Sequence, residues 1–222
     1  GAGTIAINGG LVQTSGAQTY REAITLGANT TLDGSTINNV STISGNNKSL
    51  TINGNADVDG AITGVTNLSV SGTSNLGANV TTSGTQTYTG AATLSGGDRT
   101  LTGSTINNVS TINGGSNSLT ITGNADIDGV ISNVSNLSVS GTSNLGADIT
   151  TTGTQTYSGA VTLDADVVLS TNNNNITFAE AITGSGKDLT VSTGIGAITL
   201  VNVGTSLAPL GEVLALDRHS TS

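Results

Sequence analysis

The chain has 222 residues, of which 121 are Thr (39), Gly (32), Ser (26) or Asn (24). Four aromatic residues and no Cys, Met or Trp leave few of the side chains that build catalytic clefts, disulfide frameworks or thiolate metal sites. Only 9% of the residues are charged, with a net charge of −9, and the five Lys and Arg lie far apart in the sequence. This composition disfavours both charge-driven disorder and nucleic-acid binding.

Targeting and membrane signals are not apparent in the sequence. No apolar run approaches the roughly 20 residues that span a bilayer, and the first residues lack the basic and apolar blocks of a signal peptide. Because the chain contains no Met, we expect it to be a processed segment of a longer protein. Abundant Ser, Thr and Asn without Cys favour an extracellular or bacterial cell-surface location, and we expect no membrane insertion.

Internal repetition begins after a first alternating segment, Thr4–Ile7, which predicts a strand. Residues 35–81 match residues 104–150 at 35 of 47 positions without a gap. The tripeptide Gln-Thr-Tyr occurs at 18–20, 86–88 and 155–157. The chain therefore consists of three long repeats, 14–81, 82–150 and 151–219, of which the third has diverged.

A shorter spacing, from position i to i+18, runs inside each long repeat. It relates Leu50, Leu68 and Gln86, then Leu119, Leu137 and Gln155, and finally Leu189 and Leu207. We interpret each long repeat as four units of about 17 residues. Each unit is too short for two helices and alternates apolar with small polar residues, which predicts short half-buried strands separated by Gly, Asn and Asp corners.

A fixed register through changes of sequence is typical of a solenoid rather than of a sandwich or meander. The sequence therefore predicts an all-β fold in which residues 1–222 form one continuous single-chain parallel β-solenoid of about 12–13 turns of 17–18 residues. Inward columns should contain Ile52, Val58, Ile121, Ile127, Val139, Leu145 and Ile149, with Tyr157 above Val139 and Val167 above Ile149. Neither end has a cap, and 207–216 is apolar and aperiodic, so we expect end-to-end self-association through exposed strand edges.

Tracts such as Thr82–Ala91, followed by Leu101–Ile106, resemble the repeats of large secreted bacterial exoproteins of the filamentous haemagglutinin type. The resemblance covers most of the chain and is one of repeat style. It implies a right-handed parallel β-helix that projects from the cell and carries adhesive regions. The family's N-terminal secretion domain is not present in this sequence.

The sharpest local motif is Asn-Ala-Asp-x-Asp-Gly, which occurs twice and matches the first half of a calcium loop. Its candidate ligands are Asn55, Asp57, Asp59, Asn124, Asp126 and Asp128. The twelfth loop position holds Thr66 or Ser135 instead of Glu, so we favour outward, solvated carboxylates and expect no metal site and no cofactor. The pairs Asp57/Asp59, Asp126/Asp128 and Asp164/Asp166 also have a spacing that glycosidase carboxylates could use, but no aromatic platform lies near them.

Three further features bear on function. The three Tyr residues should fill the interior rather than bind a ligand. His219 is the only His, so neither a catalytic triad nor a zinc site is expected. Ser/Thr columns such as Thr51, Ser69, Thr87 and Thr120, Ser138, Thr156 face outward, but Thr-x-Thr pairs at 85/87 and 154/156 come only once in four units, which disfavours ice binding.

The sequence thus favours a non-catalytic shaft segment of a bacterial secreted or cell-surface repeat protein, stacked on neighbouring solenoid units of the same protein. A self-assembling extracellular fibre subunit is the first alternative. A polysaccharide-active β-helix enzyme and an ice-binding solenoid are further alternatives. No receptor can be named from these residues.

Overall fold

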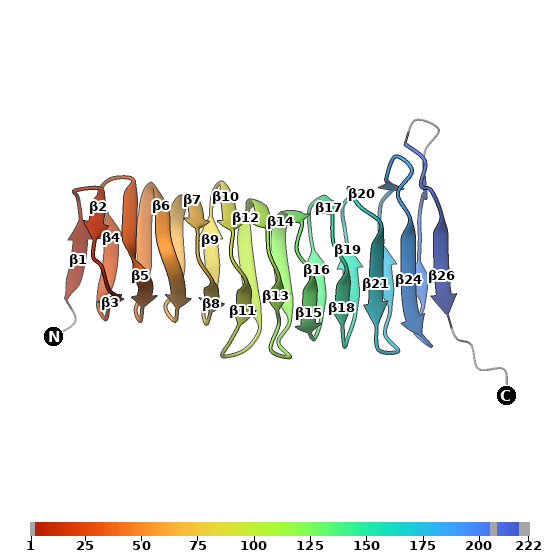
Figure 1. The fold of residues 1–222 in the computed structure, drawn as a ribbon, viewed down its shortest axis with the longest axis horizontal. Coiled ribbons are helices and arrows are strands. Elements are labelled where there is room, and N and C mark those ends of the chain that lie inside the picture. The colour runs from red at the N-terminus through yellow and green to blue at the C-terminus, as the bar shows by residue number, and fades with distance from the viewer. Residues whose placement is uncertain (1–2, 205–207, 218–222) are drawn as a thin grey trace.

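A computed structural model of the chain describes residues 3–204 and 208–217. It is an all-β parallel solenoid of about 10 turns, and every pairing between its strands is parallel. The N- and C-terminal strands lie at opposite ends of a rod (Figure 1). With about 4.8 Å per turn the rod is about 48 Å long. The predicted fold class is confirmed, whereas the predicted 12–13 turns were too many.

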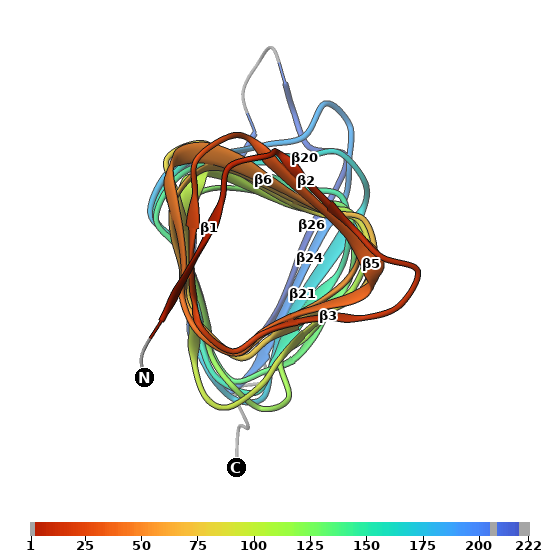
Figure 2. The same cartoon turned by 90° about the vertical axis from the view of Figure 1, so that its left-hand side faces the viewer.

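The rod has three sides, which we number by the first strand on each (Figure 2). Strands confined to the first face are β1 (Thr4–Ile7), β4 (Ala23–Leu26), β9 (Val80–Thr82), β16 (Leu137–Val139), β19 (Gln155–Tyr157), β22 (Ile176–Phe178) and β25 (Ile198–Thr199). Strands confined to the second face are β2 (Leu11–Gln13), β10 (Thr85–Tyr88), β17 (Ser143–Leu145), β20 (Val161–Leu163) and β23 (Ile182–Thr183). Strands confined to the third face are β3 (Gln18–Tyr20), β8 (Ser74–Leu76), β11 (Ala92–Leu94), β13 (Ile112–Asn113), β15 (Ile131–Val134), β18 (Ile149–Thr151), β21 (Val167–Thr171), β24 (Leu189–Gly194) and β26 (Val213–Asp217).

Five longer strands bend around corners and serve more than one face. The first and second faces share β7 (Ile62–Val70), β12 (Arg99–Asn108) and β14 (Leu119–Ile127); the second and third share β5 (Thr30–Asn39); and β6 (Ile43–Val58) passes along all three. Each turn of the chain therefore visits the first, second and third faces in order.

The core is a set of apolar ladders inside the rod. All seven residues predicted to face inward are at most 1% exposed. Ile121, Val139 and Tyr157 stack as predicted, and Leu163 continues the column of Ile127 and Leu145. The predicted partner of Ile149 was wrong, because Leu169 rather than Val167 pairs with it. The turn that contains Leu169 has a longer corner, which moves the register by two positions.

Unequal turn lengths explain the error in the turn count. On the third face, the ladder that starts at Gln18 has its shortest steps near the middle of the rod, as from Ala56 to Ser74. Its steps lengthen toward the C-terminal end, where Leu169 is followed by Val191 and then by Ala215. The spacing from i to i+18 that is visible in the sequence is therefore the shortest step of this ladder. Corner loops add residues elsewhere without changing the ladder.

The long repeat does not contain a whole number of turns. Four ladder steps from Gln18 lead to Ala92, which lies one face beyond Gln86. Four steps from Gln86 lead to Val161, again one face beyond Gln155. Each long repeat thus spans three and two-thirds turns rather than four. The Gln-Thr-Tyr segments of the three long repeats therefore lie on the third, second and first faces in succession.

Asn and Asp side chains continue the hydrogen-bonded ladder at the corners, where the backbone turns away. Asn55, Asn67 and Asn136 each accept a bond from the backbone N–H of the residue 18 positions later, at 2.9–3.0 Å. Asp148 accepts from the Val168 N–H at 2.8 Å in the same way. Asn is frequent at the corners because its side-chain oxygen accepts a hydrogen bond from a backbone N–H of the next turn.

Candidate functional site: the polar groove of the second face

A shallow groove of about 330 Å³ lies on the second face. Strands β12, β14, β17 and β20 carry it, and its polar lining includes Thr105, Asn124, Asp126, Thr142, Asn144 and Thr162. Alternation along each strand places these side chains outward while their neighbours, such as Ile127 and Leu145, enter the core. The groove is therefore a product of the same alternation that builds the interior.

A carboxylate, amide and carboxylate bridge three successive turns at this groove. Asn144 Nδ2 donates to Asp126 Oδ1 at 3.0 Å and to Asp164 Oδ2 at 2.6 Å. Burial, and then the charges of Asp126 and Asp164, raise the pKa of the nearby Asp128 carboxyl above its usual value. The amide offsets part of the repulsion between two carboxylates, and the cluster presents acceptor oxygens to solvent.

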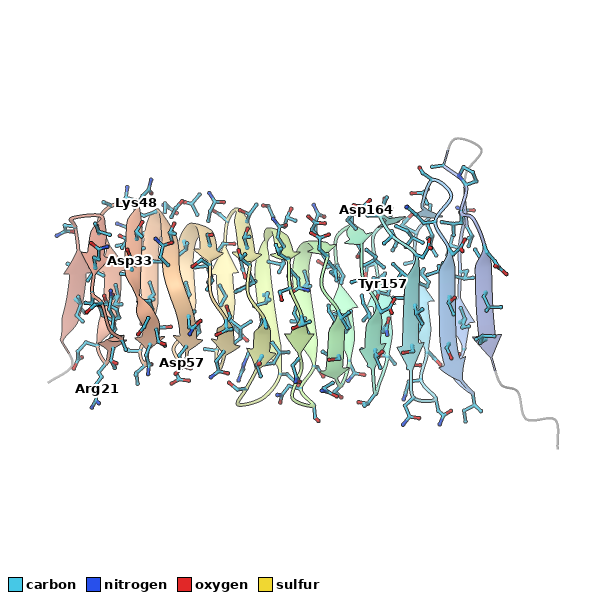
Figure 3. All side chains as sticks on the ribbon, in the orientation of Figure 1. Arg21, Asp33, Lys48, Asp57, Tyr157 and Asp164 are labelled. Carbon is cyan, nitrogen blue, oxygen red and sulfur yellow. The ribbon has the colours of Figure 1, made fainter. Side chains whose placement is uncertain are left out.

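The first copy of the motif has a simpler arrangement on the third face. There Asn75 Nδ2 donates to Asp57 Oδ1 at 2.8 Å. Ser95 follows Leu94 where Asp164 follows Leu163, so the third carboxylate is missing. Figure 3 labels Asp57 and Asp164, which lie on opposite edges of the rod in that view.

Four of the calcium candidates, Asn55, Asp57, Asn124 and Asp126, lie in extended strands rather than in a curled loop, and Asp59 and Asp128 lie one residue beyond those strands. Asn55 and Asn124 use Oδ1 to accept bonds from the Thr73 and Thr142 N–H groups. Alternate residues of a strand are about 6.7 Å apart, whereas two oxygens on one calcium ion lie within about 5 Å of each other. Among the described residues no three Asp, Glu or His side chains are placed to hold a metal.

We therefore predict that calcium leaves the stability unchanged. Thermal melts in calcium and in chelator should agree within error, since Asp57 and Asp126 already have Asn partners and lack a further ligand. A chelator-induced fall in Tm of more than about 5 °C, roughly 1 kcal/mol, would establish the Asn-Ala-Asp-x-Asp-Gly segments as metal sites.

Sequence reasoning missed a buried Gln clamp. Gln86 is fully buried; its Nε2 donates to Thr102 O at 2.7 Å and to Val80 O at 3.2 Å, and its Oε1 accepts from the Tyr88 hydroxyl at 2.9 Å. Gln18 with Tyr20 and Gln155 with Tyr157 repeat this network on the other two faces. The signal was available, because an inward Tyr in a strand implies that the residue two positions earlier is also inward.

The Tyr residues are interior side chains, as predicted. Tyr157 stacks on Phe178 of the next turn with ring centroids 5.1 Å apart, and Tyr88 is 1% exposed. Tyr20, in the first turn, is half-buried. The hydroxyl groups are used internally by Gln and are not offered to a ligand.

We expect this arrangement to make the fold sensitive to alkali. Burial raises the pKa of the Tyr88 and Tyr157 hydroxyls well above the ordinary value. Above about pH 10 the unfolded chain releases protons that the folded chain keeps, so stability is fully present below that pH and falls as pH rises, by at most about 1.4 kcal/mol per pH unit for each Tyr. Urea midpoints measured from pH 8 to pH 11 should fall steeply, and Tyr88→Phe with Tyr157→Phe should flatten the curve. An equally steep curve for the double variant would contradict this origin.

Of the remaining sequence candidates, Asp128 lies near Asp126 and Asp164, and the others are not brought together. Asp59, Asp128 and Asp166 are exposed, and His219 lies outside the described residues. The described residues contain no helix long and apolar enough to cross a membrane. Comparison with protein-family models, curated proteins and solved structures found no match to this chain.

Proposed function

We propose that this chain is a non-catalytic shaft segment of a bacterial secreted or cell-surface repeat protein of the filamentous haemagglutinin type. The observation that carries the proposal is the unbroken parallel ladder from β1 to β26, in which one hydrogen-bonded step is repeated about ten times. Such an array transmits load along its axis and gains length by copying units. Its role would be to hold an adhesive region away from the cell surface.

The sequences at the junctions between long repeats favour growth of the rod by duplication of a long repeat. Thr81 is followed by Thr-Ser-Gly-Thr-Gln-Thr-Tyr in the chain, and Thr150 by Thr-Thr-Gly-Thr-Gln-Thr-Tyr. Each junction leads into a strand with a buried Gln clamp. The clamp of Gln86 lies on the second face and that of Gln155 on the first. A strand with its corner is therefore interchangeable between faces.

Deletion of residues 82–150 tests this proposal. We expect the shortened chain to remain folded, because residue 151 takes the place of residue 82, and small-angle scattering should show a rod shorter by about 18 Å. Loss of fold in this deletion would contradict a shaft that grows by duplication.

Deletion of residues 82–143 is the control for that experiment. It removes a similar length but joins two outward positions, Thr81 and Asn144. Alternation would then turn Asn144 inward and expose Leu145, so we expect this chain to be much less stable or not to fold. Equal stability of the two deletions would mean that the junction register does not matter.

A second candidate function, a self-assembling fibre subunit, is favoured by apolar side chains at the two ends of this chain. Leu11 in the first turn is 57% exposed, and Leu214 and Leu216 in β26 are each 44% exposed. In the described residues β26 pairs on one edge only, with β24. Unpaired parallel edges with apolar neighbours are suited to head-to-tail stacking of copies.

Sedimentation of the purified chain separates the two candidates. A fibre subunit should associate with increasing concentration, and Leu214→Lys with Leu216→Lys should suppress this. Val168→Lys is the control, since Val168 is similarly exposed, at 41%, but lies on the third face away from the end strand. A monomer at every concentration would remove the fibre candidate and leave the shaft.

A further inference from the structure

The first face carries two outward columns of hydroxyl groups that the sequence repeats do not reveal. One column contains Thr25, Ser44 and Thr63 and continues through Thr81, Thr102 and Thr122; between Thr63 and Thr81 it is placed by the pairing of the preceding residues, Ile62 and Val80. The neighbouring column contains Thr100, Thr120, Ser138, Thr156, Thr177 and Thr199. Together they place at least one Ser or Thr on every turn from β4 to β25. Two Thr-x-Thr pairs, at 100/102 and 120/122, lie on adjacent turns where the columns overlap.

The columns arise because each long repeat advances by three and two-thirds turns. Equivalent positions of successive long repeats therefore fall on different faces, and residues from different parts of the repeats are brought into one line on the first face. The expectation of one Thr-x-Thr pair in four units assumed a whole number of turns in the long repeat. With that assumption removed, two Thr-x-Thr pairs fall on adjacent turns of the first face, and each remaining turn from β4 to β25 contributes one hydroxyl to the columns.

The chemistry of the first face differs from that of the other two. Two charged residues lie along the described strands of the first face, and both are outside the two columns. Arg99 donates its guanidinium N–H groups to the carbonyl oxygens of Leu76 and Ser95 at the corner. Lys48 of β6 pairs with Val65, which pairs with Thr82 of β9, so it lies at the edge where the first face turns toward the second. Outward columns of the second and third faces are interrupted by an Asp and an Asn, namely Asp126 with Asn144 and Asp57 with Asn75.

The hydroxyl groups of the two columns are available to a ligand. None of the twelve has a side-chain hydrogen bond to another described residue. The array is therefore neutral, and its donors and acceptors are free.

Divergence between the repeats supplies a second, independent observation. Three exposed positions exchange a hydroxyl for an amide between the first and second long repeats: Ser44 against Asn113, Asn53 against Thr122, and Asn47 against Ser116. In the first two pairs the hydroxyl lies on the first face, whereas Asn113 lies on the third face and Asn53 on the second. In the third pair both residues have positive φ at corners, and there the hydroxyl follows a third-face strand. The exchange follows the face at the two positions of the hydroxyl columns and not at this corner.

We propose that the first face binds ice. A regular array of hydroxyls is complementary to a ligand that itself repeats, and here the spacing is about 4.8 Å along the rod and, on the two turns where the columns overlap, about 6.7 Å along a strand. These are of the order of the oxygen spacings in an ice surface. Thr presents a methyl group beside its hydroxyl on a stiff side chain, and the hydrogen-bonded ladder behind it holds the array in place.

Other ligand classes match this face less well. A protein partner would need aromatic, Met or Arg anchors, and none of the large exposed hydrophobic side chains lies within the described strands of the first face. Nucleic acid would need clustered cations. Soluble sugars would need a concave site, and a crystalline polysaccharide would need outward aromatic rings, which these described strands lack. A neutral, ordered layer of water needs none of these.

Partition into slowly growing ice tests the proposal on the intact chain. The long repeats offer a matched pair of variants: Thr120→Lys with Thr122→Lys changes the first face, and Thr51→Lys with Asn53→Lys changes the same Leu-x-Ile-x-Gly segment on the second face. We expect the unmodified chain to concentrate in the ice fraction. The first double variant should be excluded like a non-binding protein, and the second should partition like the unmodified chain.

A single-site pair guards against loss of fold. Thr156→Lys and Thr87→Lys alter the same Gln-Thr-Tyr segment on the first and second faces, and circular dichroism melts should be equal within each pair. Exclusion of the unmodified chain from ice would overturn the proposal. Equal losses from the first-face and second-face variants would also overturn it, and so would binding to crystalline cellulose without binding to ice.

Discussion

Replacement of Ile127 by Asp should cost at least about 4 kcal/mol of unfolding free energy. Ile127 is fully buried between Asn108 and Leu145 of the adjacent turns. An Asp carboxyl there would lose apolar contacts and would have to be buried either neutral or unpaired. Equilibrium unfolding in urea should show a large fall in the midpoint, or a chain that does not fold.

The adjacent residue provides the control. Asp126 is outward and half-buried, with one bond from Asn144 at 3.0 Å, so Asp126→Ala should cost no more than about 1 kcal/mol. Similar losses from the two substitutions would mean that the inward and outward positions of β14 have been assigned wrongly.

Replacement of Gly123 by Ala should have the next largest effect, a loss of about 3 kcal/mol. Gly123 has a φ of 135°, and an added Cβ would lie 1.8 Å from the carbonyl oxygen of Gly103 in the preceding turn. Both atoms belong to backbone that is held by the ladder, so the contact can be relieved only by moving a corner. Thermal melts should show a clear fall in Tm.

Gly16→Ala is the matched control for this corner. Gly16 lies in the first turn, and an added Cβ would meet nothing within 4 Å. The substitution should change stability by less than about 1 kcal/mol. If both Ala variants were equally stable, close approach of corners would not be what requires Gly in this fold.

The fold class and the inward residues could be predicted because a solenoid repeats one constraint. Alternation fixes the face of each residue, and like residues recur above one another, so Ile121 and Val139 were placed without a structure. The number of turns could not be predicted in this way. It depends on the length of each corner, and no marker in the sequence distinguishes the long step from Val191 to Ala215 from the short step between Ala56 and Ser74.

The polar features also divide into those that local alternation predicts and those that depend on pairing across turns. Local reasoning placed Asp57 and Asp126 outward, but the Asn144 bridge to Asp164 depends on a pairing across turns. The hydroxyl columns of the first face depend on the fractional turn of the long repeat, a quantity that no single segment encodes. Gln86 is the exception, since its inward position follows from Tyr88 two residues later.

Distance measurement between spin labels at Thr25 and Thr122 is the most direct test of the central claim, the three-sided register. These residues are far apart in sequence, and the ladders place them in one column on the first face with five turns between them. The account predicts a narrow distribution centred at about 24 Å, five steps of the ladder. A broad distribution, or one centred far beyond that distance, would show that the intervening chain does not complete five turns and would contradict the register on which the faces depend.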